Sequence, residues 1–173
     1  VSGSGIAARG AGAIDLAGNR VDGLQIRAHL RDPALFGANV VLEQARLEGT
    51  LDGPFRDSTF SHEARIGRIT AGTISAQGIL QRGTARWDGT RLALPLRASV
   101  ARITSGNALF DPRLVNGGMA GNFSWQGNAL TAPELALRFQ GLEGRLAFAT
   151  DLATGLTRLT GPVRAQGLPF ANV

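Results

Sequence analysis

The sequence predicts an all-β protein, built as an elongated and repetitive antiparallel meander. Three observations support this fold class: apolar and polar residues alternate in many short runs, turn-forming dipeptides separate those runs, and glycine is frequent. The 24 glycines among 173 residues are about twice the usual share of roughly 7%. They are spread along the chain instead of gathered in one linker, which is typical of many tight turns.

The clearest alternation occurs in residues 92–100, where the even-numbered positions are apolar and the odd-numbered ones are mostly small or polar. This is the pattern of a strand with one buried face. Residues 24–30, 135–139 and 146–148 repeat it. Pro95 lacks an amide donor, so a strand containing it must place it at an edge, at a bulge or beside an unpaired stretch.

Turn-forming sequences separate the alternating runs at short intervals: Gly18-Asn19, Asp52-Gly53-Pro54, Asp88-Gly89, Gly127-Asn128 and Gly161-Pro162. Such sequences favour hairpins whose central residues adopt positive φ. With strands of roughly 5 to 10 residues, we expect on the order of a dozen strands, nearly all joined by hairpins.

One stretch, residues 32–47, has a feature of helices, because Asp32-Pro33 is a good N-cap and first-turn pair. Gly37 and the β-branched pair Val40-Val41 oppose a helix. We therefore expect a loop followed by a strand through residues 40–42, with a helix as the less favoured alternative.

Two weak repeats indicate duplicated strand-turn-strand units. The first has Gly, apolar residues two and four positions later, Gly at six, Asn or Thr at seven and Leu or Val at nine, and it occurs near 12–21, 83–92 and 121–130. The second matches residues 30–35 with 109–114. The uneven spacing excludes a solenoid of fixed period. Because the strand-and-turn pattern continues to both ends, we expect residues 1–173 to be a single segment of a longer repetitive β protein.

The charge and the reactive residues argue against several function classes. The net charge of +5 comes from arginine alone, and no basic block marks a nucleic-acid partner. There is no Cys, and His29 and His62 lack a catalytic signature or metal-ligand spacing. We expect no enzyme activity, no metal and no cofactor. No stretch approaches the roughly 20 apolar residues that span a bilayer.

What remains is a one-sided apolar face, which an antiparallel sheet must hide from water. Its candidate residues are mostly aliphatic, which suits contact with lipid acyl chains, although the core of a β-sandwich would use the same residue types. Both interpretations are therefore kept: a lipid-binding surface, or a structural or adhesive β-sandwich or solenoid domain with no ligand. The candidates are Trp87, Leu92, Leu94, Leu96, Val100, Trp125, Leu135, Leu137 and Phe139.

Four stretches together resemble a known family: residues 12–19 (GAIDLAGN), 32–38 (DPALFGA), 45–53 (ARLEGTLDG) and 159–163 (LTGPV). They are similar to the middle part of proteobacterial YdbH-type proteins, relatives of the AsmA and TamB proteins, whose domain has carried a dicarboxylate-transport label. A small dianion needs convergent donors in a closed polar site, which an aliphatic face does not offer.

The resemblance implies a long sheet curled into a β-taco-like groove with open edges at both ends. It also implies a periplasmic location, an N-terminal anchor in the inner membrane that lies outside this segment, and a path toward the outer membrane. Phospholipids would move along the apolar interior with their acyl chains shielded. The resemblance supplies no catalytic residues.

Overall fold

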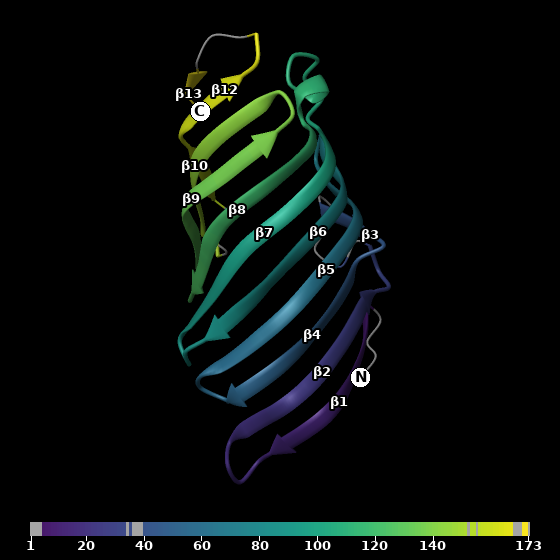
Figure 1. Cartoon of the computed structure of the whole chain (residues 1–173), viewed down its shortest axis with the longest axis vertical. Helices are drawn as coiled ribbons and strands as arrows, with labels where there is room; N and C mark the ends of the chain where they lie inside the picture. The colour runs from purple at the N-terminus through teal and green to yellow at the C-terminus, as the bar shows by residue number, and fades with distance from the viewer. Residues whose placement is uncertain are drawn as a thin grey trace.

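The computed structural model describes residues 5–33, 35, 40–151, 153–154, 156–167 and 171–172. Their strands form one antiparallel sheet of 13 strands, long, twisted and curled (Figure 1). The main path runs β1-β2-β4-β5-β6-β7-β8-β9-β10-β12-β13, while β3 pairs with β5 and β11 pairs with β10. The predicted all-β antiparallel meander is confirmed.

Nine of the described strands have 9 to 14 residues, which is long for a globular protein. Most successive strands are neighbours in the sheet. Their bounds are β1 Ile6–Asp15, β2 Arg20–Leu30, β3 Val40–Glu43, β4 Arg46–Pro54, β5 Ser58–Ala71, β6 Ile74–Trp87, β7 Arg91–Thr104, β8 Val115–Gln126, β9 Ala129–Phe139, β10 Leu142–Asp151, β11 Thr157–Thr160, β12 Pro162–Ala165 and β13 Ala171–Asn172. A short 3₁₀ helix, η1, spans Asp111–Arg113 between β7 and β8.

The predicted turn sequences all lie at strand ends. Asn19, Gly89 and Gly127 adopt positive φ of 52°, 90° and 55°, the conformation that tight hairpins require. The three copies of the first repeat each cover a strand end, a turn and the next strand start. Since β1, β6 and β8 run in the same direction through the antiparallel order, the three repeated turns lie at the same end of the sheet.

Pro95 lies inside a central strand, and its missing amide interrupts the ladder on one side. Strand β7 pairs with β8 through Pro95 itself, opposite Asn122. Toward β6, the paired positions of the described residues stop at Ala93 and resume at Ala98. The predicted unpaired stretch beside Pro95 is therefore confirmed. Pro95 does not lie on an edge strand, because β7 has β6 and β8 as neighbours.

The segment with the helical feature contains a strand, β3, which pairs with β5. The expected strand through residues 40–42 is confirmed, while residues 34 and 36–39 lie outside the described part of the chain. The second repeat contains the same signal as Asp111-Pro112, and there it begins the 3₁₀ helix η1. One Asp-Pro pair thus lies before strand β3, and the other begins a single helical turn.

Among the described residues, no second layer lies over the sheet. Its chain of 18.0 kDa has an accessible surface of 11133 Å², whereas a compact monomer of this mass exposes about 8,000 Å². Within the described residues no large side chain is completely buried, and all strands belong to one sheet. The two closed sheets of a β-sandwich are therefore not formed by these residues.

Candidate functional site

The strand register places the nine predicted residues on one face of the sheet. Residues directly opposite each other in an antiparallel pair point to the same side. Leu92 lies opposite Trp87 on one neighbouring strand and opposite Trp125 on the other. Alternation along β7 and β9, with the pairs that join them through β8, adds the remaining candidates to the same side: Leu94, Leu96, Val100, Leu135, Leu137 and Phe139.

The same face continues through residues that were not among the nine candidates. We call the whole surface the apolar face, and it extends through the following further residues: Leu24, Ile26, Leu47, Leu51, Phe60, Ile66, Ile79, Met119, Phe123, Leu142, Leu146, Phe148 and Val163. Glycines lie among them and weaken the alternation in the sequence. Since glycine is also the typical residue of turns, the alternation on these strands is hard to recognise in the sequence.

Some of these glycines make room for aromatic rings from the next strand. A Cβ atom at Gly117 would overlap three ring atoms of Phe139, and one at Gly49 would lie 2.7 Å from two ring atoms of Phe60. Each ring therefore lies across the neighbouring backbone instead of standing away from the sheet. The rings therefore do not protrude from the apolar face at these points, and the face stays continuous.

The apolar face is covered at one end and exposed at the other. Val100, Phe139 and Leu142 form a buried cluster, against which Phe110 and Leu114 pack from the β7–β8 connection. At the opposite end of the sheet, the indole of Trp125 is 47% exposed although its Nε1 donates to the carbonyl of Gly127 at 2.8 Å. The face is thus accessible from the end where the repeated turns lie.

One polar pair interrupts the apolar face. The ring of His62 stacks on Phe60, with centroids 5.1 Å apart, and its Nε2 lies 2.8 Å from Oε1 of Gln81. Its Nδ1 lies 3.0 Å from the carbonyl oxygen of Phe60. A neutral imidazole donates from only one nitrogen, so turning the Gln81 amide over satisfies both contacts at the ring. Either way, one buried polar atom of the Gln81 amide has no hydrogen-bond partner among the described residues.

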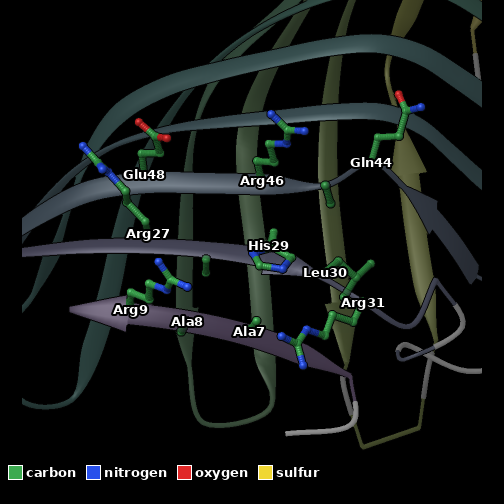
Figure 2. A pocket seen from close by; sticks show the side chains of 12 residues that line it. Ala7, Ala8, Arg9, Arg27, His29, Leu30, Arg31, Gln44, Arg46 and Glu48 are labelled. Carbon is green, nitrogen blue, oxygen red and sulfur yellow. The ribbon is translucent and has the colours of Figure 1, made fainter. Parts of the chain in front are cut away.

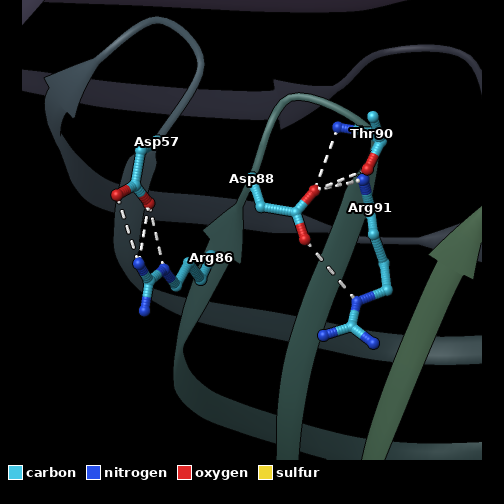
Figure 3. Close-up of polar contacts among 5 residues, drawn as sticks. All are labelled: Asp57, Arg86, Asp88, Thr90 and Arg91. Carbon is cyan, nitrogen blue, oxygen red and sulfur yellow. Dashed lines mark hydrogen bonds and ion pairs between the residues drawn. The ribbon is translucent and has the colours of Figure 1, made fainter.

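The opposite face carries charged side chains, several of them in ion pairs. Arg86 makes two hydrogen bonds to Asp57, of 3.0 and 3.1 Å, and these raise the pKa of Arg86 (Figure 3). Hydrogen bonds from Arg65 and then Arg82 lower the pKa of Glu63. The Glu63–Arg82 pair links β5 to β6, and the Arg86–Asp57 pair links β6 to the turn before β5. We call this side the polar face.

The turn after β6 is held by a carboxylate. Asp88 Oδ1 accepts hydrogen bonds from the amides of Arg91 at 2.8 Å and Thr90 at 3.0 Å, and from the Thr90 hydroxyl at 2.8 Å (Figure 3). These bonds, the Arg91 amide first, lower the pKa of Asp88. Asp88 therefore stabilises the turn between β6 and β7.

Comparisons with protein-family models, with curated proteins and with solved structures give no match. Within the described part of the chain, no group of three or more His, Cys, Asp or Glu residues is placed to hold a metal ion, and no helix is long and apolar enough to cross a membrane. The two unlike faces of the sheet are therefore the basis for assigning a function.

Proposed function

We propose that the apolar face shields the acyl chains of phospholipids as they pass between the inner and outer membranes. In this proposal the chain is a periplasmic segment of an AsmA/YdbH-like protein, tethered to the inner membrane and contacting both membranes through regions outside this segment. The observation that supports it is a continuous apolar face on an open sheet that no second layer covers.

The energetic basis is the burial of hydrocarbon. Each methylene that leaves water for an apolar surface gains about 0.8 kcal/mol, so a lipid with its chains against Leu94, Leu96 and Leu137 avoids most of the cost of crossing an aqueous space. Because the face is continuous from strand to strand, that gain persists as the lipid moves. No deep binding well is needed, and net direction requires energy from other proteins.

A structural or adhesive domain without a ligand is the second candidate. The packing of Phe110 and Leu114 on the Val100 cluster favours it, because there the chain covers its own apolar surface. The two candidates differ in what touches the uncovered part of the face: acyl chains in the first, and only protein in the second.

The experiment that separates them is photocrosslinking in cells. We expect a photoreactive residue at Leu94 or Leu137 to capture phospholipid, since both side chains lie on the apolar face. Matched controls at Arg97 and Arg138, on the same strands but on the polar face, should capture far less lipid. Crosslinks from Leu94 and Leu137 to protein alone would contradict the transport function.

A further inference from the structure

A hollow of about 910 Å³ opens on the polar face beside β1, and arginines from three neighbouring strands surround it (Figure 2). The charged or titratable side chains that line it are Arg9, Arg27, His29, Arg31, Arg46 and Glu48. Four arginines and one carboxylate give a formal charge of +4 − 1 = +3 with the histidine neutral. The hollow is therefore strongly cationic, more so than the chain's overall +5 spread over its whole surface.

The arrangement of these arginines is unfavourable without a ligand. Arg9 lies directly opposite Arg27 in the β1–β2 pair, and like charges at opposite positions destabilise a sheet. Glu48 lies opposite Arg27 across β2 and β4. Within the described residues, however, no ion pair or side-chain hydrogen bond joins Glu48 to any of the four arginines.

Some arginines elsewhere on the polar face are paired with protein carboxylates. Glu63 binds both Arg65 and Arg82, and Asp57 binds Arg86. Other polar-face arginines, such as Arg97 and Arg145, form no ion pair within the described residues either. What distinguishes Arg9, Arg27, Arg31 and Arg46 is that these four line the same hollow. In the hollow, an anion from outside the chain would take the role that Glu63 and Asp57 have in these pairs.

Guanidinium groups suit one kind of anion in particular. The planar fork of Arg donates two parallel hydrogen bonds to a phosphate or carboxylate. Neighbouring strands are about 4.8 Å apart. Arg9 lies directly opposite Arg27, and Arg46 on β4 lies opposite His29, two residues along β2 from Arg27. The long side chains of these three arginines can therefore reach one anion of diphosphate size or two phosphates side by side. Figure 2 shows these side chains extending from the same side of the sheet.

We propose that this hollow binds a phosphate-bearing anion carrying at least two negative charges. The phosphate can belong to the headgroup of an anionic lipid or to a free phosphate compound, since both present the same oxygens to the arginines. The hollow lies on the polar face, so the site does not depend on acyl chains binding to the apolar face.

The primary experiment is calorimetric titration of the whole chain with inorganic pyrophosphate at physiological ionic strength, where weak long-range attraction is screened. The variant Arg27→Gln/Arg46→Gln removes two guanidinium groups from the hollow. We expect its affinity to fall about tenfold or more per arginine, as for charge-assisted hydrogen bonds. Pyrophosphate should also raise the unfolding temperature of the wild type and not of this variant.

The matched control is Arg97→Gln/Arg145→Gln, which removes the same charge from the polar face outside the hollow. Its affinity should stay within about twofold of the wild type, because neither residue contacts the ligand. The variant Glu48→Gln should bind more tightly, since it removes the one carboxylate. Equal losses in both double variants, or no binding to the folded wild type, would overturn the proposal.

A second arm identifies the source of the phosphate. Vesicles of phosphatidylcholine with cardiolipin, whose headgroup carries two phosphates, are sedimented with the same proteins. Vesicle binding that is lost in Arg27→Gln/Arg46→Gln and kept in the control supports a lipid headgroup. Pyrophosphate binding without vesicle binding supports a free phosphate compound. Phosphate binding by the hollow does not depend on whether a photoreactive residue at Leu94 captures acyl chains. Each proposal can therefore fail without the other.

Discussion

The fit of Phe139 over Gly117 gives the sharpest prediction about the apolar face. The glycine leaves space that the Phe139 ring occupies, and a methyl group at position 117 would overlap three atoms of that ring. The substitution Gly117→Ala therefore forces the ring away from β8. Because Phe139 belongs to the buried cluster with Val100 and Leu142, the displacement opens that cluster as well.

The expected cost follows from what the ring buries. A buried Phe side chain removes about 150 to 250 Å² from water, worth about 4 to 6 kcal/mol at 25 cal/mol per Å². Displacing it partly should cost about 1 to 3 kcal/mol, the usual range for overpacking. Removing it in Phe139→Ala should cost about 3 to 5 kcal/mol. In Gly117→Ala/Phe139→Ala the two costs should not add, since the clash has gone.

Urea unfolding followed by circular dichroism measures these differences. The control is Gly144→Ala, on the same face, where a Cβ would meet its nearest neighbours at ordinary distances of 3.4 to 3.8 Å. We expect this variant to match the wild type or to be slightly more stable, because alanine restricts the unfolded chain. If Gly117→Ala unfolds at the same urea concentration as Gly144→Ala, the claim that the Phe139 ring packs closely over Gly117 is wrong.

Two further predictions concern polar groups. The pKa of Asp88 is lowered in the folded protein, so its carboxylate stabilises the fold at pH values above the ordinary Asp pKa of about 3.9. This contribution is lost as the pH falls through the lower pKa of the folded state. The stability advantage of the wild type over Asp88→Asn in urea should therefore shrink below about pH 3.9, and a constant difference would contradict the turn's role. Replacing the pair of His62 and Gln81 in His62→Leu/Gln81→Leu should be neutral or stabilising. Gln81→Leu alone should cost about 1 to 3 kcal/mol, because it leaves the Nε2 of His62 without its partner. A double variant less stable than the wild type would refute this.

Local patterns predicted the strands well where one face is uniformly apolar. Residues 92–100 alternate without interruption and form β7 with the expected side turned to the apolar face. The alternation fails in β8, where Gly117 and Gly121 occupy positions on that face. Glycine contributes no apolar side chain to the pattern, so the space it leaves for Phe139 becomes visible only when the neighbouring strand is placed.

The cationic hollow was not predicted, because it depends on register between strands. Arg9 and Arg27 are opposite each other only because β1 and β2 pair with a register shift between Ala11 and Ala13, and a slip of one residue moves every side chain to the other face. In the sequence the arginines are dispersed. Strands β1, β2 and β4 bring Arg9, Arg27 and Arg46 to one hollow, together with Arg31 just after β2, and composition alone does not reveal this.

The central claim is that acyl chains lie against the apolar face, and the two tryptophans test it directly. Trp87 and Trp125 are the chain's only tryptophans, and both lie on that face. Phospholipids brominated in their acyl chains should quench the fluorescence of the purified chain. A single tryptophan on the polar face, Arg97→Trp in a Trp87→Phe/Trp125→Phe background, should not be quenched. Equal quenching of both proteins, or quenching of neither, would contradict the claim.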